Sequence, residues 1–405
     1  MKYIVMLGDG MADYPCEALG GKTVLEAAKT PNMDFLARNG AVGLAKTVPD
    51  GMSPGSDTAN LSVMGYDPKI YYTGRSPLEA VSIGIDLAPT DVTFRCNLVT
   101  LSDTDNYEDA EMLDYSAGEI STEEATELIN YLNEHFKTDN INLYAGVSYR
   151  HCLVIKGIKT GGVMTPPHDI SLKPIKDHLP KGENSELLLS MMKKSRELLC
   201  DHPINKKRIA QGKNPANSCW FWGEGTKQAV TSFEEKFGIR GGVISAVDLI
   251  KGIGICAGHK CIEVEGATGN YDTNFSGKAK AAVDFLDSGY DYVYIHVEAA
   301  DECGHHNDPV HKVESVEAID RDILGYIIPQ MEKRGEPFTI LLMPDHPTPL
   351  SLMTHVSDPV PFVLYRSDKK LDPNTEVYSE KAAESSGLYI EKASELVNHM
   401  ISGKI

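Results

Sequence analysis

Short apolar runs bounded by turn residues recur along this chain and predict buried strands. The first run, residues 3–7, follows the N-terminus and ends in the turn Gly8-Asp9-Gly10. Continuous apolar runs of this kind are typical of strands that are buried on both faces of a parallel sheet. In the C-terminal half such runs alternate with helical patterns, and strands are predicted at 241–245, 261–265, 292–297, 339–343 and 360–365. The alternation indicates an α/β fold, with a mostly parallel sheet that helices cover on both faces.

The middle of the chain has shorter strands and more turns. The elements predicted there are strands at 93–101, 142–144 and 151–156 and a helix at 121–135. A Gly- and Pro-rich segment at 161–182 follows, and a predicted helix at 184–200 and a strand at 218–222 come after it. We therefore predict a smaller inserted α+β domain at 92–181, and a core domain made of 1–91 and 182–405, since single cores rarely grow past about 250 to 300 residues.

Acidic residues follow three of the predicted strands. Asp9 follows the first strand, Asp301 follows the strand at 292–297, and Asp345 follows the strand at 339–343. Parallel strands present their carboxyl ends at one edge of a sheet, where open α/β sheets bind their ligands. A single aspartate is more often a cap or a surface charge, but three at equivalent positions predict a site at this edge.

Histidines accompany these aspartates at spacings that suit metal ions. His305 lies four residues after Asp301, so both side chains fall on one face of a helical turn. The other imidazoles of the group are those of His296, His346 and His355. Carboxylates and imidazoles without a thiolate favour manganese, zinc or magnesium over copper or an iron–sulfur cluster. Cys303 lies inside the same segment, and we interpret it as a small buried filler rather than a ligand.

Ser56 is the candidate nucleophile. It follows Pro54-Gly55 in a turn and precedes a predicted helix, whose first N–H groups can bind an anion. A hydroxyl beside a divalent ion needs no adjacent histidine base, because the ion stabilises the alkoxide. The alternative is that Ser56 is a helix N-cap, the more frequent role for a serine in this position. The metal-like cluster reverses that preference.

Composition excludes several classes of partner. The formal net charge of -19 argues against nucleic acid or an anionic membrane as the main partner, because both attract basic patches. No apolar run is long enough to span a bilayer, and the chain begins with no signal peptide, so we expect a cytoplasmic protein. The eight cysteines are scattered without a Cys-x-x-Cys pair, which is typical of reduced thiols. Gly20-Gly21-Lys22-Thr23 lacks the first glycine of a P-loop, since Cys16 stands there.

These motifs together resemble the archaeal-type cofactor-independent (2,3-bisphosphoglycerate-independent) phosphoglycerate mutases, which belong to the alkaline phosphatase superfamily. The resemblance spans nearly the whole chain. It rests on Gly8-Asp9-Gly10, on the Ser56 loop running into Asn60-Leu61-Ser62-Val63-Met64-Gly65, on His296-Val297-Glu298-Ala299 through Asp301 and His305, on Pro344-Asp345-His346, and on Tyr72-Thr73-Gly74-Arg75 and Gly266-Ala267-Thr268-Gly269.

The resemblance implies an alkaline-phosphatase-like fold and a site for two divalent metal ions, Mn²⁺ or Zn²⁺ first and Mg²⁺ third. It implies that one ion is held by Asp9, Ser56, Asp345 and His346, and the other by Asp301, His305 and His355. In the family reaction the serine takes the phosphoryl group from 3-phosphoglycerate as a phosphoserine and returns it to the 2-hydroxyl of the bound glycerate. The substrate is thus a small phosphorylated acid. Closure of the inserted domain is expected to exclude water from the intermediate.

An acidic protein that binds an acidic substrate must gather cations locally. Arg150 and His151 in the inserted domain are candidates, because arginine suits bidentate binding of carboxylate or phosphate. The further candidates are Arg75, His168, Asp169 and Lys278. A surface role is the alternative for each of these residues. Ser56 is followed by Asp57-Thr58, and the inserted domain is shorter than in bacterial mutases, so their substrate residues cannot be transferred to this chain.

Three other functions compete with the mutase. A homoserine kinase-like phosphotransferase would use the same site with another hydroxyl, although the missing P-loop counts against direct use of ATP. A phosphatase or phosphonate hydrolase would release its product to water instead of forming an isomer. A metal-binding structural protein would use the cluster only to stabilise the fold. The oligomeric state stays open from the sequence.

Overall fold

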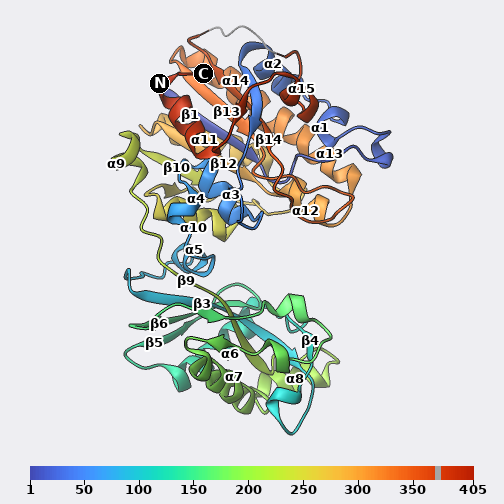
Figure 1. Cartoon of the computed structure of the whole chain (residues 1–405), viewed down its shortest axis with the longest axis vertical. Helices are drawn as coiled ribbons and strands as arrows, with labels where there is room; N and C mark the ends of the chain where they lie inside the picture. Colours follow the sequence, from blue (N-terminus) through green and yellow to red (C-terminus); the bar gives the residue numbers. More distant parts are fainter. Residues whose placement is uncertain (370–374) are drawn as a thin grey trace. The chain divides into compact units, whose positions relative to one another are not determined.

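The apolar run after the N-terminus forms strand β1 (Lys2–Gly8), which lies inside an eight-stranded sheet in the computed structural model (Figure 1). The structure describes residues 1–369 and 375–405. The sheet order is β11-β10-β12-β1-β13-β14-β2-β15, and β1 pairs in parallel with both of its neighbours. The other strands are β2 (Ala41–Ala45), β10 (Gly241–Ile244), β11 (Lys260–Cys261), β12 (Tyr292–Val297), β13 (Phe338–Met343), β14 (Val360–Arg366) and β15 (Tyr389–Ile390). Only β14 runs antiparallel to its neighbours, so the mostly parallel sheet predicted from the sequence is confirmed.

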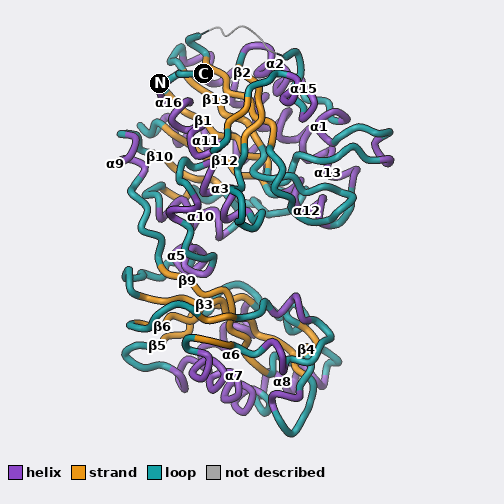
Figure 2. The backbone as a smooth tube through the Cα atoms, viewed as in Figure 1, coloured by secondary structure: helices purple, strands orange, loops and turns teal. Residues whose placement is uncertain are grey.

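Helices cover both faces of this sheet, as Figure 2 shows. Alternate side chains of a strand point to opposite faces, and Ile4 and Met6 of β1 pack into the core formed with α2 (Pro31–Asn39), α11 (Phe275–Asp287) and α14 (Gly325–Arg334). The opposite face carries α3 (Ser56–Val63), α10 (Asp248–Cys256) and α16 (Leu396–Ser402). The remaining α-helices around this sheet are α1 (Val24–Ala27), α4 (Pro68–Tyr71), α9 (Phe233–Phe237), α12 (Ala299–His305), α13 (Pro309–Ala318) and α15 (Glu380–Ser385).

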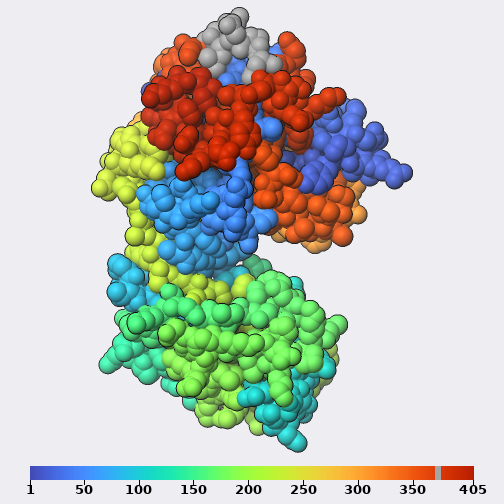
Figure 3. All heavy atoms as spheres, viewed as in Figure 1, coloured from blue at the N-terminus to red at the C-terminus, as the bar shows by residue number. Residues whose placement is uncertain are grey.

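This sheet and its helices form the first of two units, which we call unit 1. It consists of Met1–Tyr72 and Val230–Ile405, so it is built from both ends of the chain. In Figure 3 the N-terminal residues, in blue, and the C-terminal residues, in red, pack together over its surface. Thr73–Ala229 form unit 2.

Unit 2 has an antiparallel sheet around β3 (Asp91–Leu101). Its order is β4-β3-β6-β5, and β9 (Ser218–Thr226) also pairs with β3. The other elements are β4 (Met112–Asp114), β5 (Ile141–Tyr144), β6 (Arg150–Lys156), a small ribbon of β7 (Gly162–Val163) and β8 (Lys181–Gly182), and helices α5 (Ser76–Ser82), α6 (Thr122–Phe136), α7 (Ser185–Leu199) and α8 (Pro203–Ala210). Apolar side chains of α6 and α7 pack against one face of the sheet, and α5 contacts β3 and β9.

Unit 2 is larger than the inserted domain expected at 92–181. The expectation ended at the Pro-rich segment and assigned the helix at 184–200 and the strand at 218–222 to the core. In the structure this strand is β9, which pairs with β3 from Val92 to Val99, and this helix is α7, which packs on β9. The boundary differs because β9 finds its partner more than a hundred residues earlier in the chain, and local patterning does not reveal such a pairing.

Two findings bear on the expected environment of the chain. Among the residues that the structure describes, no helix has both the length and the apolar composition that a bilayer-spanning segment needs. All eight cysteines have free thiols.

A buried ion pair in unit 1 holds the loops that follow β1 and β13. Lys312 of α13 donates to Asp13 Oδ2 and to the carbonyl of Thr348, each at 2.7 Å. Asp13 also accepts a hydrogen bond from the backbone N–H of Leu350 at 3.2 Å. Both charged side chains are buried, with exposed fractions of 0% and 1%. A buried charge that loses its partner is strongly destabilising, so this pair is a sensitive point of the fold.

We predict that Lys312→Met lowers the free energy of unfolding by about 3 to 5 kcal/mol, because it leaves the Asp13 carboxylate buried without a cation. Urea unfolding followed by circular dichroism measures the loss. Lys392→Met is the control, because Lys392 pairs with Asp67 at 3.1 Å but its side chain is 59% exposed. Its loss should be far smaller. Equal losses in the two variants would contradict the role given to the Lys312 pair.

Candidate active site

Three aspartates meet at the carboxyl edge of the unit 1 sheet. Asp9 follows β1, Asp345 follows β13, and Asp301 lies in α12, which begins just after β12. All three side chains are buried. The three strands are neighbours and run parallel, so their ends lie at the same edge. The sheet topology therefore brings together carboxylates that are far apart in the sequence.

Possible ligand atoms form two groups at this edge. One group contains Asp301, His346 and His355, and the other contains Asp9, Asp345 and His346; within each group the ligand atoms lie within 4.8 Å of one another. His305 adjoins the first group, because its Nε2 lies 3.2 Å from Asp301 Oδ2 and 2.8 Å from His355 Nε2. The structure thus brings together all six metal-ligand side chains expected from the sequence besides Ser56, and His346 belongs to both groups.

The charge balance at Asp9 favours a cation. Burial, and next the negative charges of Asp345 and Asp301, raise the pKa of Asp9 well above its usual range. Its Oδ1 is buried and accepts a hydrogen bond from none of the described residues. A buried carboxylate oxygen without a hydrogen bond costs free energy that a bound cation would remove.

The imidazoles are oriented as metal ligands would be. Nδ1 of His305 donates to the carbonyl of Met353 at 3.0 Å, and Nδ1 of His355 donates to the carbonyl of Pro54 at 2.8 Å. In the neutral rings these bonds leave the lone pairs on the two Nε2 atoms, which face each other and Asp301. The hydrogen bond with Asp301 raises the pKa of His305 to about 9. A proton on His305 Nε2 would compete with a metal ion for the same lone pair.

Ser56 stands at the start of α3 and reaches the same edge. Its Oγ lies 3.2 Å from His346 Nε2, and Gly55 is the N-cap residue. The N-cap role considered for Ser56 is therefore taken by its neighbour. The hydroxyl instead lies beside an imidazole that both ligand groups share.

Several polar side chains lie behind the site and support it, and one of them, His296, was expected from the sequence as a member of the imidazole group. His296 is fully buried; its Nε2 lies 2.9 Å from Asp9 Oδ2, and its Nδ1 lies 3.1 Å from Ser245 Oγ. Burial lowers its pKa to about 3, so the ring is neutral and supports Asp9. Thr348 donates to Asp301, and Asn60 donates to Asp345. His296 and Asn60 lie in motifs that the sequence singled out, whereas Ser245 and Thr348 carried no sequence signal.

Two of the side chains expected at the substrate are buried. Lys278 is 0% exposed and donates to the carbonyl of His296 at 2.8 Å. Burial lowers its pKa to about 8. His151 accepts a hydrogen bond from the backbone N–H of Gly146, and burial lowers its pKa to about 3, so its ring is neutral. Neither residue presents a cation to solvent, because Lys278 of α11 is fully buried and the buried ring of His151 is neutral.

The other expected substrate residues lie in unit 2, in a set that we call the arginine cluster. Arg75 pairs with Glu79 at 2.9 Å, and Arg95, which sequence reasoning missed, pairs with the same carboxylate at 2.8 Å. The Arg95 guanidinium lies over the ring of Trp222, 4.0 Å from its centroid. Arg150 is near enough to help lower the pKa of Glu79. The arginine cluster consists of Arg75, Arg95 and Arg150. Its three positive charges exceed the single negative charge of Glu79.

His168 and Asp169 lie near the arginine cluster. The His168 ring packs edge-on against Trp222, with centroids 5.3 Å apart. Its Nε2 is 3.6 Å from Asp169 Oδ1, and both side chains are exposed. These two residues are accessible, in contrast to His151.

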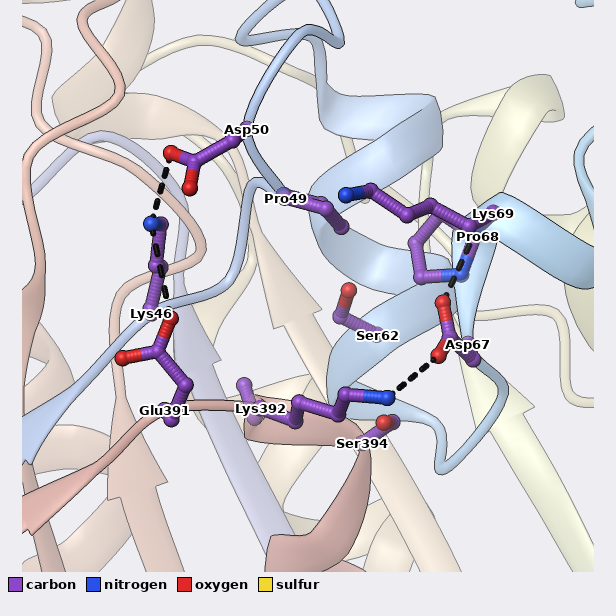
Figure 4. Close-up of a pocket in the computed structure, with 11 residues that line it drawn as sticks. Lys46, Pro49, Asp50, Ser62, Asp67, Pro68, Lys69, Glu391, Lys392 and Ser394 are labelled. Carbon is purple, nitrogen blue, oxygen red and sulfur yellow. Dashed lines mark hydrogen bonds and ion pairs between the residues drawn. The ribbon is translucent and has the colours of Figure 1, made fainter.

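Figure 4 shows a pocket of unit 1 that contains none of the candidate ligands. Five of its charged side chains form ion pairs with one another. Lys46 lies 2.7 Å from Asp50 and 3.6 Å from Glu391, and Lys392 lies 3.1 Å from Asp67. Asp50 belongs to the loop that leads to Ser56, but its side chain is 84% exposed, and none of the pocket's side chains belongs to either ligand group.

Fold and site define the class of this protein as an α/β enzyme with a serine hydroxyl beside a carboxylate and imidazole centre. The family model of 2,3-bisphosphoglycerate-independent phosphoglycerate mutase matches residues 37–205. A protein of that name from Methanosarcina barkeri is 50% identical, with 100% of both chains covered. A probable one from Geobacter sulfurreducens is 52% identical over 99% of this chain and 100% of its own.

Two solved structures agree with this relationship. A cofactor-independent phosphoglycerate mutase from Thermoplasma acidophilum is 27% identical with a TM-score of 0.69, and 99% of each chain is covered. The PH0037 protein from Pyrococcus horikoshii is 32% identical with a TM-score of 0.82, over 99% of this chain and 96% of that one. The chain belongs to the family of 2,3-bisphosphoglycerate-independent phosphoglycerate mutases, and the resemblance seen in the sequence is confirmed.

We predict that a chelator of divalent ions abolishes activity while the far-ultraviolet circular dichroism stays essentially unchanged, because the sheet has an extensive apolar core of its own. Adding Mn²⁺ back should restore activity, with two ions bound per chain by elemental analysis. Unfolding on chelation would instead favour the structural metal-binding protein.

Proposed function

We propose that this chain interconverts 3-phosphoglycerate and 2-phosphoglycerate without 2,3-bisphosphoglycerate, through a phosphoserine at Ser56. The observation that carries the proposal is the Ser56 hydroxyl, 3.2 Å from His346 Nε2 and at the edge where the ligand groups meet. The names of full-length relatives at about 50% identity support the substrate. They do not favour the homoserine kinase-like phosphotransferase or the phosphatase.

In this proposal the carboxylates and imidazoles hold two divalent ions. Asp9, Asp345 and His346, with Ser56, hold one ion, and Asp301, His305 and His355 hold the other. Such ions lower the pKa of a nearby hydroxyl and neutralise the charge of a phosphoryl group. The oxygen and nitrogen donors favour Mn²⁺ or Zn²⁺, with Mg²⁺ as the third candidate.

The reaction then consists of two transfers at one serine. Ser56 Oγ gives up its proton and forms a bond to phosphorus while the bond from phosphorus to the 3-oxygen of the substrate breaks, and the 3-oxygen takes up a proton. The glycerate stays bound and turns, its 2-hydroxyl gives up its proton and attacks the same phosphorus, and Ser56 Oγ leaves and takes up a proton. Helix α3 begins at Ser56, so the positive end of its dipole would favour the negative charge of a phosphoryl group on that serine.

We propose unit 2 as the substrate-binding cap. The arginine cluster supports this role, because a chain of net charge -19 must concentrate cations where it binds an acid. Arginine suits the bidentate binding of a carboxylate, and the turning glycerate needs its carboxylate held. A cytoplasmic location fits this soluble substrate and the eight free thiols.

Ser56→Ala should lower kcat by about 10⁴-fold or more, because no other hydroxyl takes its place as the nucleophile. The assay couples 2-phosphoglycerate formation from 3-phosphoglycerate to enolase, without added 2,3-bisphosphoglycerate. Ser62→Ala is the matched control, since Ser62 lies on the same helix and donates to the carbonyl of Thr47 at 2.6 Å. It should keep near-normal activity. Substantial turnover by Ser56→Ala would disprove the nucleophile. Release of free phosphate, or phosphohomoserine made from ATP, would favour the competing functions.

Arg150→Ala should raise the KM for 3-phosphoglycerate about 10- to 100-fold, because a hydrogen bond to a charged group contributes about 1.5 to 3 kcal/mol. The control is Lys206→Ala, an exposed cation of unit 2 that pairs with Asp201 at 3.0 Å. Steady-state kinetics of both variants give the comparison. A KM that changes equally little in both would remove Arg150 from the substrate site.

A further inference from the structure

Asn60 occupies a central position between the nucleophile helix and the sheet edge. It lies in α3, one turn after Ser56, and its side chain is fully buried. Its Nδ2 donates to the carbonyl of Ser56 at 2.9 Å and to Asp345 Oδ2 at 2.8 Å. Its Oδ1 accepts a hydrogen bond from the Tyr294 hydroxyl at 2.6 Å. Both amide protons and the amide oxygen therefore have partners.

Tyr294 fixes the direction in which the amide points. The hydroxyl comes from β12 and is also fully buried. It donates to Oδ1, so Nδ2 must face Asp345. The reversed amide would set Oδ1 against a carboxylate oxygen, two acceptors with no proton between them. The orientation of Asn60 is thus imposed by a residue on a different element.

The Asp345 carboxylate is held by three donors. Its Oδ1 accepts hydrogen bonds from the backbone N–H groups of Gly10 at 3.2 Å and His346 at 2.9 Å. Those two donors belong to the loops after β1 and β13. Asn60 supplies the third hydrogen bond, and among the described residues it is the donor that ties this carboxylate to the helix carrying Ser56.

A buried asparagine inside a helix lowers the stability of the helix, so its presence at position 60 indicates a specific role. Asparagine is a poor helix former, and a buried polar side chain needs every partner satisfied. The neighbouring positions Ala59, Leu61 and Val63 are buried and apolar. At position 60 an amide can donate to Ser56 and Asp345 while it accepts from Tyr294, which an apolar side chain or a carboxylate cannot do.

We propose that Asn60, oriented by Tyr294, is a positioning residue that couples Ser56 to Asp345. Its two hydrogen bonds fix the distance between the helix turn that carries the Ser56 hydroxyl and the Asp345 carboxylate. The nucleophile and the ion that Asp345 holds are thereby kept at a constant separation. This inference rests on the proposed function, because it assigns Ser56 and Asp345 the roles of nucleophile and ligand. Loss of the Asn60 amide should lower kcat and the affinity for the metal ion, while the KM for the substrate stays nearly constant.

The experiment compares Asn60→Ala and Tyr294→Phe with Asn39→Ala. Asn39 is the matched control, since its Nδ2 also donates to the carbonyl four residues earlier, that of Phe35 at 2.8 Å, but on α2. For Asn60→Ala we expect kcat to fall about 100-fold, KM to change less than about twofold, and the Kd for Mn²⁺ by calorimetry to rise about 10- to 100-fold. Tyr294→Phe should show smaller changes of the same kind, and Asn39→Ala should show none.

The double variant should be no worse than Asn60→Ala, because Tyr294 acts through Asn60. Thermal unfolding of each chain, measured without metal, separates positioning from stability. Normal kcat and Mn²⁺ affinity in Asn60→Ala would overturn the inference. Full additivity of the Tyr294→Phe and Asn60→Ala effects in the double variant would also overturn it. A third contrary result would be equal losses of kcat and Mn²⁺ affinity in Asn60→Ala and Asn39→Ala at equal stability.

Mn²⁺ affinity makes the two proposals separable. If the wild-type chain forms no 2-phosphoglycerate while Asn60→Ala still weakens Mn²⁺ binding, the proposed function fails and the link between Asn60 and the ligand group stands. If the wild-type chain is an active mutase and Asn60→Ala leaves Mn²⁺ affinity and kcat unchanged, the positioning role alone fails.

Discussion

The crowding of three buried carboxylates at one edge of the sheet is the constraint on which the other features depend. Asp9, Asp301 and Asp345 are brought there by neighbouring parallel strands. Burial and mutual repulsion raise the pKa of Asp9, so the edge cannot stay fully ionised without positive charge. His305 and His355 direct Nε2 lone pairs to the same place, because carbonyls hold their Nδ1 atoms. An acidic chain thereby acquires a local site for cations, and through them for phosphate.

Helix α3 adds the nucleophile to this edge. The helix begins at Ser56 on the face of the sheet opposite the large apolar cluster, and Asn60 joins it to Asp345. In the loop before it, the Pro54 carbonyl accepts a hydrogen bond from His355. The same segment therefore positions the hydroxyl, one carboxylate and one imidazole. A small displacement of α3 and its preceding loop would therefore move the Ser56 hydroxyl relative to both Asp345 and His355.

Much of this arrangement could be predicted from sequence, because it depends on local patterns. Apolar runs marked β1, β12 and β13, and the acids after them marked the edge. Local patterns do not reveal the features that long-range pairing decides. The extent of unit 2 depends on β9 pairing with β3, and the burial of Lys278 and His151 depends on tertiary packing. Arg95 looks like an ordinary strand residue until Trp222 and Glu79 are placed beside it. Asn60 carries a signal only once Ser56 is taken as the nucleophile.

The most direct test of the central claim is the mass of the Ser56 peptide after acid quench of the metal-loaded enzyme turning over 3-phosphoglycerate. We expect the phosphoryl group on Ser56, formed as fast as or faster than 2-phosphoglycerate. Continued formation of 2-phosphoglycerate with Ser56 unmodified at every quench time, or with the phosphoryl group on another side chain, would contradict the account.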